Sequence, residues 1–536
     1  MKRESLPHFS SLAVLVLLSS TLAAAAPRLI HAVRRDTSSS LREMALAGSI
    51  SLQGASQEKP EPRPTRGLLS NSSPDPVAQQ LSGGLLGVTS GLNFEGQSAQ
   101  DNRNLMGFAF VPPDTNGAVG ATQFVQMVNV TLAVYDKSSG ALQLGPELIH
   151  TLWSGFGGLC EFGGGTPTFA DGGDPVVLYD HLAGRWLVTQ LQYDSTFTKT
   201  AQCVAVSTTS DATGSYNRYE FDFGANFPDY PKFGVWPDAY YNSINVFPGH
   251  GFAGAEACAF DRAAMLVGAP AAAICFQQPP SVSSLLPADL DGRTLPPAGA
   301  PNYFVGLADS SHLGLYKFHA DFANPGNSTF LGPTLISVAP YSEICARANT
   351  VACIPEPNPG EKVDGLSDRV MFRLAYRNFG DHESLVVNHT VAGGALGGVR
   401  WYEIRNPTSA SAVFQQGTIV DPDVNYWLGS IAMDKAGNTA LGFSASGRQL
   451  NPSIYVAGRQ PDDPPNILAG PLVLANGGGV QVQSFKRWGD YSSMTLDPTD
   501  DCTFWYTNEY YPATGSFAWS TRIGAFKFDS CKGRGK

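Results

Sequence analysis

A short phrase recurs along the chain at a nearly constant interval. It consists of Pro, Gly or Ser, then Asp, and then a run that is mostly apolar and aromatic. Two weaker copies carry Asn or Ser in place of the aspartate. The copies lie 60 to 66 residues apart, at Asp114, Asp174, Asp238, Asn302, Asp368, Ser430 and Asp490. Seven units of similar length are typical of a repeat architecture, in which each unit is one supersecondary element.

The sequence between the phrases is typical of short strands joined by tight turns. Turns such as Asp180 to Gly184 and Asp434 to Gly437 carry Asp and Gly, which tolerate tight hairpin conformations. Charged residues make up 15% of the chain, against a usual value of about 25%, and helical periodicity is nearly absent. A unit of about 60 residues fits four strands with long loops, since strands average about 5–6 residues.

These observations predict an all-β fold, a seven-bladed β-propeller of four-stranded antiparallel blades. A pair of β-sandwiches is the alternative. It explains the composition equally well, but it does not explain the even spacing of the phrases. The hairpin turns resemble those of secreted β-propeller proteins over roughly residues 105–530. The chain lacks the Ser-x-Asp-x-Gly-x-x-Trp box of sialidase-type blades and the Trp-Asp ending of WD40 repeats, so the resemblance implies an architecture and carries over no catalytic residue.

The first residues have the pattern of a secretory signal peptide. Lys2 and Arg3 are followed by an apolar run from Leu12 to Leu22 and by alanines at 23–26. This run is too short to span a bilayer, and no later stretch reaches about 18 apolar residues. We expect residues 1–26 to be a signal peptide, so that the protein is secreted, extracellular or periplasmic, without a membrane span.

Amino-acid composition divides the rest of the chain into two regions. Residues 27–85 contain a serine run at 38–40, a proline-rich stretch at 59–64 and few aromatic residues. Such a segment is expected to be a disordered leader or pro-segment. Residues 86–536 are predicted to form a single β-propeller domain.

All eight cysteines lie beyond the signal peptide, and an even number in an exported protein favours disulfide bonds. Sequence alone leaves the connectivity open. Pairing of nearest neighbours is the framework that we favour: Cys160 with Cys203, Cys258 with Cys275, Cys345 with Cys353, and Cys502 with Cys531. Sequons at Asn71, Asn129, Asn327 and Asn388 predict a glycoprotein if the host glycosylates exported chains.

The repeated aspartates are the candidate binding residues. In a propeller the innermost strand of each blade lines the central channel. If the phrase opens that strand, a ring of carboxylates forms at one channel mouth: Asp114, Asp174, Asp238, Asp368 and Asp490. Residues just before four of the phrases are expected to form the wall: Lys232, Phe233, Trp236, Asp364, Tyr426, Trp427, Lys486, Arg487 and Trp488. Aromatic faces stack on sugars, and paired acids hold hydroxyls or supply an acid and a base. Asp238 and Asp490, each two residues after a tryptophan, are expected to be the most exposed.

Each of these residues also has a structural explanation. An aspartate before a strand accepts backbone N–H bonds and fixes the turn, and a tryptophan can be a wedge between blades. Converging carboxylates repel one another. The ring therefore predicts raised pKa values, hydrogen bonds from backbone, or a bound cation such as Ca²⁺.

Two classes of function remain after this reading. The first is a secreted propeller that binds a glycan, a cation or a protein at the mouth of its channel. The second is an extracellular carbohydrate-active enzyme, a glycoside hydrolase or polysaccharide lyase, that uses the same carboxylates. We favour binding because no asymmetric acid–base pair stands out, but the sequence does not decide whether the protein is an enzyme.

The net charge of the chain and the motifs that it lacks exclude several classes of binding partner. The net charge of −11 is unsuited to binding nucleic acid. The sequence carries no zinc, phosphate-loop, dinucleotide or nucleophilic-serine motif. We expect a monomer whose partner is a polysaccharide or a cell-surface glycan.

Overall fold

The protein is built mostly from β-strands. The computed structural model describes residues 26–48, 57–58, 69, 74–79, 84–163, 171–249, 251–345, 352–357, 361–482 and 486–531. Consecutive strands pair antiparallel in ladders of four. The signal peptide expected at residues 1–26 lies outside the described residues except for residue 26. Among the described residues, no helix is long and apolar enough to cross a membrane.

The ladders follow the order of the chain. The first three comprise β5 (Asn116–Val119), β6 (Gln123–Val128), β7 (Thr131–Asp136) and β8 (Leu142–Leu148); β9 (Val176–Asp180), β10 (Arg185–Tyr193), β11 (Thr200–Ser207) and β12 (Tyr216–Gly224); and β13 (Asn226–Val235), β14 (Tyr240–Pro248), β15 (Gly254–Phe260) and β16 (Ala272–Gln277). The next three comprise β17 (Leu286–Asp291), β18 (Asn302–Asp309), β19 (His312–His319) and β20 (Thr329–Ser337); β23 (Met371–Asn378), β24 (Glu383–Gly393), β25 (Leu396–Arg405) and β26 (Ala412–Ile419); and β27 (Val424–Met433), β28 (Thr439–Gly447), β29 (Leu450–Arg459) and β30 (Ala469–Ala475).

The last ladder joins both ends of the domain. Its strands are β31 (Ser493–Leu496), β32 (Thr503–Tyr510), β33 (Ser520–Phe528) and the early strand β3 (Val88–Ser98). β3 pairs antiparallel with β33, with Val88 opposite Phe528. This pairing ties the start of the domain to its end.

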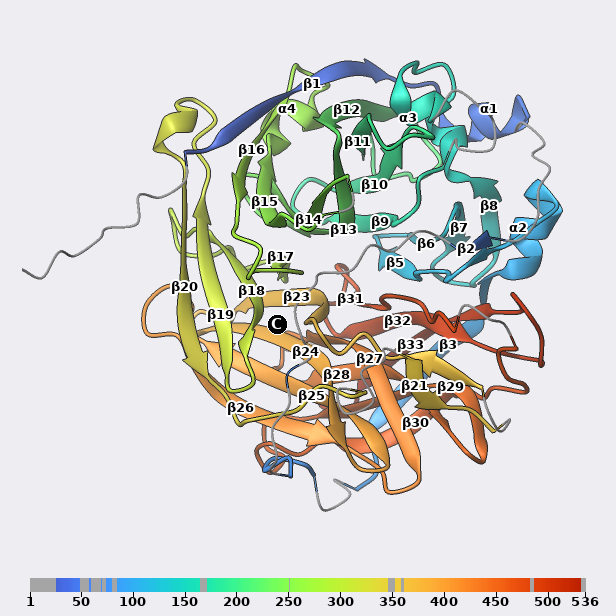
Figure 1. Ribbon diagram of the computed structural model, residues 1–536, viewed down its shortest axis with the longest axis vertical. Coiled ribbons are helices and arrows are strands. Elements are labelled where there is room, and N and C mark those ends of the chain that lie inside the picture. Colours follow the sequence, from blue (N-terminus) through green and yellow to red (C-terminus); the bar gives the residue numbers. More distant parts are fainter. Residues whose placement is uncertain are drawn as a thin grey trace, which may run out of the picture.

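The first strands of the ladders surround a common centre (Figure 1). β5 contacts β9, and the contacts continue in order through β13, β17, β23, β27 and β31, which contacts β5 again. Side chains link these neighbours: Asn116 Oδ1 accepts from Val177 N at 2.8 Å, and Asp289 Oδ1 accepts from Val235 N at 2.9 Å. β17 and β23 also pair directly, in parallel.

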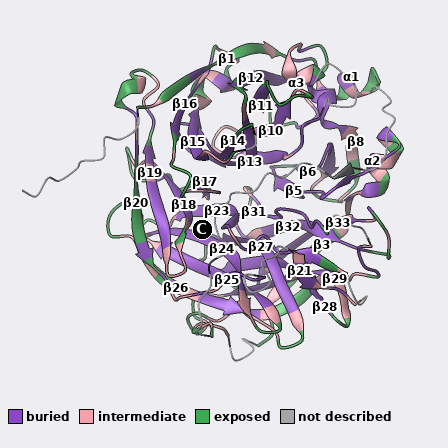
Figure 2. Ribbon diagram, viewed as in Figure 1, coloured by how far each residue is buried: buried purple, intermediate pink, exposed green. Residues whose placement is uncertain are grey.

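The remaining elements are short. The α-helices are α1 (Leu41–Leu46), α2 (Ala99–Met106), α3 (Leu159–Phe162) and α4 (Arg262–Leu266), and the 3₁₀ helices are η1 (Ile149–Trp153) and η3 (Pro325–Asn327). Two small sheets are formed by β2 (Gln57–Glu58) with β4 (Phe110–Val111), and by β21 (Ala352–Pro355) with β22 (Lys362–Asp364). Figure 2 shows that exposed residues lie mainly at the rim of the molecule, while the inner strands are buried.

The expectation of a disordered leader is wrong for residues 28–46. β1 (Arg28–Thr37) pairs on one side with β12 and on the other with β16, and so joins two ladders into a nine-stranded sheet. α1 follows, with Ser40 as its N-cap and Leu41 buried. Composition did not reveal the strand because most β1 side chains are exposed, so the segment shows no apolar pattern. Main-chain pairing with two strand edges holds β1, and the buried side chains of Ile30, Leu41 and Met44 add apolar contacts.

The disulfide prediction is confirmed for all four pairs, Cys160–Cys203, Cys258–Cys275, Cys345–Cys353 and Cys502–Cys531. Four disulfides fit an oxidising environment. The asparagines of the sequons differ in their exposure to solvent. Asn129 and Asn388 are completely buried, whereas Asn327 is exposed. Asn71 lies outside the described residues.

The repeated phrase marks two different places in the ladders. At 114, 174, 368 and 490 it lies two or three residues before the first strand, as expected, whereas Ser430 lies inside its first strand, β27. Asp238 instead lies between β13 and β14, and Asn302 begins β18, so these two phrases open second strands. The assumption that all seven phrases are equivalent is therefore wrong for these two copies.

Candidate functional site

Three of the predicted aspartates gather where the first strands begin. Asp114 and Asp174 lie two residues before β5 and β9, and Asp490 lies three residues before β31. Together with Tyr230 and Lys232 of β13 and with Tyr491, these residues form what we call the aspartate cluster. Asp114 and Asp490 are buried, whereas Asp174 is half-buried.

A left-handed residue recurs at the start of several ladders. Asp114 has a φ of 46° and Asp174 a φ of 47°, and Tyr230 in β13 has a φ of 54°. Aspartate adopts this conformation more readily than most residues because its short polar side chain bonds locally. Tyr230, and not Asp238, thus occupies in the third ladder the place that Asp174 has in the second.

The carboxyls of the cluster link neighbouring ladders. Asp114 Oδ1 accepts from Asp490 N at 2.7 Å, and Asp114 Oδ2 accepts from Asn129 Nδ2 at 2.7 Å. Asp174 Oδ2 accepts from Tyr230 N at 3.1 Å. The bonds from Asp490 and Tyr230 cross between ladders, so these aspartates do more than fix their own turns.

A lysine lies at the middle of the cluster. Lys232 is completely buried, and its Nζ is 3.6 Å from the ring centroid of Tyr230 and 3.8 Å from that of Tyr491. Its Nζ donates to Pro231 O at 3.0 Å. The two rings provide cation–π contact on a charge that is removed from water.

Burial moves the pKa values of the cluster away from their usual ranges. The pKa of Asp114 is raised well above its usual value, first by burial and then by the charges of Asp490 and Asp174. The pKa of Lys232 is lowered to about 8 by burial, although Asp174, Asp490 and Asp114 act in the opposite direction. Burial thus favours the protonated form of Asp114 and the neutral form of Lys232 relative to the same groups in water.

Two predicted residues border the cluster. Asp368 is half-buried and accepts from Arg369 Nε at 2.8 Å, and the Arg369 guanidinium is 4.5 Å from the ring centroid of Tyr230. Arg487 donates to Asp490 Oδ1 at 2.8 Å and also pairs with Asp364. Asp368 and Arg487 are thus near the expected place, each held by a charge partner.

The two tryptophans and Asp238 do not lie where the sequence predicted. Trp236 is 1% exposed and packs edge-on against Tyr303 and Tyr376, and Trp488 is 0% exposed and packs against Trp427 and Tyr511. Both are core wedges and offer no face to a sugar. Asp238 is exposed outside the cluster and accepts from Tyr241 OH at 3.1 Å. Asp490, expected to be open, is 4% exposed.

The sequence pattern missed several members of the site. Arg369 and Tyr491 each follow a phrase aspartate directly, and that adjacency was the available signal. Tyr230 also directly follows a Pro-Asp pair, Pro228-Asp229, which is not among the seven evenly spaced phrases. Asn129 lies in the turn between β6 and β7, and only the fold brings it to the cluster.

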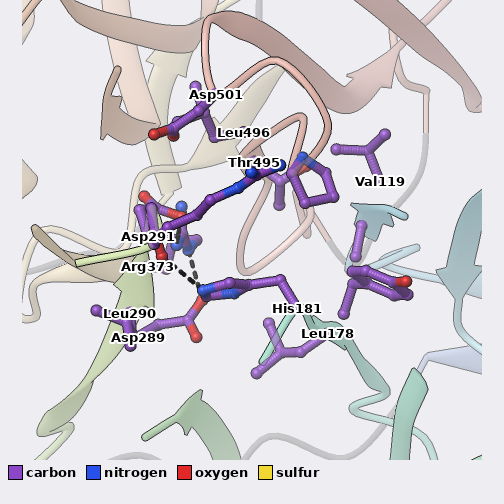
Figure 3. Close-up of a pocket in the computed structure, with 15 residues that line it drawn as sticks. Val119, Leu178, His181, Asp289, Leu290, Asp291, Arg373, Thr495, Leu496 and Asp501 are labelled. Atoms are coloured by element: carbon purple, nitrogen blue, oxygen red, sulfur yellow. Dashed lines mark hydrogen bonds and ion pairs between the residues drawn. The ribbon is translucent and has the colours of Figure 1, made fainter. Parts of the chain in front are cut away.

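A second group of charged residues lies at the other end of the first strands (Figure 3). A cavity of about 40 Å³ is lined there by the last residues of β5, β9, β17 and β31 and by Arg373 of β23. Arg373 Nε donates to Asp289 Oδ2 at 2.7 Å, its Nη2 donates to Asp291 Oδ1 at 2.6 Å, and its Nη1 donates to Met494 O at 3.2 Å. We call this group, Arg373 with Asp289 and Asp291, the arginine pocket.

Comparison with known proteins identifies no family. The chain matches no family model and no curated protein. Solved structures with distant likeness include an endo-arabinase from Bacteroides thetaiotaomicron VPI-5482 (10% identity, 65% of this chain and 92% of that chain covered, TM-score 0.27) and an α-L-arabinanase from Penicillium chrysogenum complexed with arabinobiose (10%, 69% and 98%, TM-score 0.32). The endosialidase of phage phi92 is another (8%, 84% and 70%, TM-score 0.31). Likenesses this distant assign no activity to the chain.

Proposed function

We propose that the protein is an extracellular seven-bladed β-propeller that hydrolyses a neutral glycan at the aspartate cluster. The ladders number seven when the one closed by β3 is included, and the closed order of contacts among their first strands supports a blade arrangement around one channel. The cluster then lies at one mouth of that channel. The disulfides support an extracellular or periplasmic location.

The observation that carries the proposal is the contrast between Asp114 and Asp174. Hydrolysis of a glycosidic bond needs one protonated carboxyl and one carboxylate. The environment of Asp114 raises its pKa and so favours its protonated form. Asp174 is a second carboxyl within electrostatic range of Asp114, and it is the more exposed of the two. We assign Asp114 as the proton donor and Asp174 as the base or nucleophile.

The charge of the site favours a neutral substrate. Acidic side chains in and around the cluster outnumber basic ones: Asp114, Asp174, Asp229, Asp364, Asp368 and Asp490 against Lys232, Arg369 and Arg487. An excess of carboxyls repels uronic or sialic acids. Carboxyls and guanidinium groups do hydrogen-bond sugar hydroxyls, and this mode of recognition replaces the tryptophan stacking predicted from the sequence.

One observation favours binding without catalysis. Both oxygens of Asp114 already accept hydrogen bonds, from Asp490 N and Asn129 Nδ2. A carboxyl held in this way stabilises the junction of two ladders whether or not it transfers a proton. A glycan-binding propeller without turnover is therefore the second candidate.

The test measures release of reducing ends from neutral and from uronic-acid polysaccharides by the purified protein. We expect turnover on a neutral polysaccharide that falls by about 10²–10⁴-fold in Asp174→Asn and Asp114→Asn. The matched control is Asp238→Asn, an exposed aspartate outside the cluster. Full turnover in Asp174→Asn contradicts the catalytic assignment. Calorimetric binding of a glycan without any turnover establishes the second candidate instead.

A further inference from the structure

Four buried side chains around the segment 487–489 each present an oxygen that has no hydrogen-bond partner. The exposed fractions are 3% for Glu356, 1% for Gln481, 0% for Glu509 and 0% for Tyr511. The oxygens are Glu356 Oε2, Gln481 Oε1, Glu509 Oε1 and Tyr511 OH. A buried polar atom without a partner is rare in folded proteins, because it loses its bonds to water and gains none.

The other polar atoms of the same side chains tie them to one place. Glu356 Oε1 accepts from Gln481 N at 2.9 Å, and Gln481 Nε2 donates to Arg487 O at 2.7 Å. Glu509 Oε2 accepts from Gly489 N at 2.8 Å. The amide of Gln481 and the carboxyl of Glu509 thus hold the two ends of one three-residue segment.

Tyr511 completes the group. Its ring packs on Trp488, the middle residue of that segment, with centroids 5.8 Å apart. Tyr511 lies two residues after Glu509, directly beyond the end of β32. Both Glu509 and Glu356 act electrostatically on the Tyr511 hydroxyl.

Within the described residues, the two glutamates have no basic partner. Among the side chains that the structure describes, no lysine or arginine bonds Glu356 or Glu509. The adjacent arginine, Arg487, pairs instead with Asp364 and Asp490. Two carboxyls buried together without a cation are strongly unfavourable in their charged forms.

We propose that Glu356, Gln481, Glu509 and Tyr511 bind a calcium ion through these four oxygens. Ca²⁺ takes carboxylate, amide and hydroxyl oxygens in a flexible shell. Zn²⁺ is disfavoured because the group offers neither imidazole nor thiolate, and Mg²⁺ because it demands near-ideal octahedral geometry and dehydrates reluctantly, whereas Ca²⁺ accepts irregular geometry.

Other carboxyl groups in the described residues are weaker candidates. Glu256 lies close to the sulfurs of Cys258 and Cys275, and Asp434 lies close to those of Cys502 and Cys531. In both groups the sulfurs are joined in disulfides and are not thiolate ligands. The site around segment 487–489 has four oxygen donors instead.

The ion would hold the segment that presents Asp490. Glu509 bonds Gly489 N, and the next residue along the chain donates its N–H to Asp114. Calcium bound to Glu509 would therefore also hold Asp490 in its position in the aspartate cluster. The calcium site stands independently of the glycan proposal, because its test measures metal binding and unfolding and uses no glycan.

The experiment treats the purified full chain with EDTA, removes the chelator, and titrates CaCl₂ while unfolding temperature and heat of binding are recorded. We expect a saturable rise in unfolding temperature and one bound Ca²⁺ per chain by elemental analysis. MgCl₂ at the same concentrations is expected to give a much smaller shift. No shift with CaCl₂ in the EDTA-treated protein overturns the proposal, and so does an equal shift with MgCl₂.

Variants locate the ion. Glu509→Gln and Glu356→Gln are expected to weaken Ca²⁺ binding at least tenfold, while their unfolding temperature in EDTA equals or exceeds that of the parent, since each removes a buried carboxyl. Two variants are used so that a folding failure in one leaves the other to decide. Glu147→Gln, a half-buried glutamate of β8, is the matched control and is expected to keep the calcium response. An unchanged calcium response in both cluster variants contradicts the assignment.

Discussion

The two ends of the first strands bury a cation among aspartates in opposite ways. In the arginine pocket, burial acts against the charge of Arg373, but Asp291 and Asp289 together outweigh it, and the pKa of Arg373 is raised. In the aspartate cluster, burial outweighs Asp174, Asp490 and Asp114, and the pKa of Lys232 is lowered to about 8.

The geometry of the contacts explains the difference. The guanidinium of Arg373 places separate N–H groups on Asp289 and Asp291 at 2.7 and 2.6 Å. The ammonium of Lys232 lies between two aromatic rings and hydrogen-bonds a backbone carbonyl. A guanidinium whose N–H groups are bonded to two carboxylates keeps its charge and stabilises the structure. An ammonium that contacts two aromatic rings and one carbonyl loses its proton more easily. The arginine pocket therefore stabilises the fold, whereas the aspartate cluster is suited to proton chemistry.

The largest effect is expected from Arg373→Met in the arginine pocket. Removing the guanidinium leaves Asp289 and Asp291 buried without their partner, which costs about 3–5 kcal/mol of unfolding free energy. Urea unfolding at pH 7 measures this loss. A triple variant that adds Asp289→Asn and Asp291→Asn is expected to recover part of it, because the unpaired charges are gone. A loss below about 1 kcal/mol would show that this ion pair is not the structural tie described.

The next effect concerns the pH dependence of stability that Lys232 confers. Its pKa is about 8 in the folded protein against 10.5 ordinarily. Between these values the unfolded chain binds more protons than the folded one, so stability rises with pH. The rise amounts to about 3 kcal/mol, at 1.36 kcal/mol for each pKa unit.

Lys232→Met isolates this contribution. The difference in unfolding free energy between parent and variant, measured from pH 7.5 to 10.5, is expected to shift in favour of the parent as pH rises. The subtraction cancels the tyrosines that titrate in the same range. A flat difference means that Lys232 keeps its ordinary pKa, and the contrast between the two ends would then disappear.

A smaller effect is expected from Tyr491→Phe. The hydroxyl donates to Pro175 O at 3.3 Å, so its removal costs about 1 kcal/mol. The ring remains over Lys232, and the pH dependence assigned to Lys232 is expected to persist. Tyr491→Leu removes the ring as well and is expected to lower the pKa of Lys232 further. Loss of the pH dependence in Tyr491→Phe would mean that the hydroxyl, and not the ring, governs the lysine.

The repeated phrase predicted the ladders because it marks a turn that each unit needs. Asp114 and Asp174 supply a left-handed residue at the start of the first strand, and aspartate is a residue type from which that conformation can be anticipated. Tyr230 adopts the same conformation and directly follows Pro228-Asp229, a Pro-Asp pair that fits the even spacing less well than Pro237-Asp238 does. The apparent copy at Asp238 therefore displaced the prediction by one strand. Nearest-neighbour cysteines were predicted correctly because Cys258 and Cys275 lie opposite each other on adjacent strands.

Contacts between distant parts of the chain were beyond prediction. β1 is held by strand edges about 190 and 240 residues away in sequence, and nothing in its own residues announces them. The same holds for Glu509 and Gln481, whose shared segment is apparent only in the fold. Composition correctly indicated short strands, but it treated polar residues as solvated when many of them are buried and paired.

The smallest effect is expected from Asp238→Asn, and it tests the register on which the comparison depends. Asp238 is exposed in the hairpin between β13 and β14, and its Oδ2 accepts one bond from Tyr241 OH, which an amide oxygen can also accept. The unfolding free energy is therefore expected to change by less than about 0.5 kcal/mol, with glycan turnover or binding unchanged. Asp174→Asn differs because Asp174 Oδ2 holds Tyr230 N across two ladders beside Lys232. If Asp238→Asn impaired function as strongly as Asp174→Asn, Asp238 would be equivalent to Asp174. The functional site would then include all five phrase aspartates.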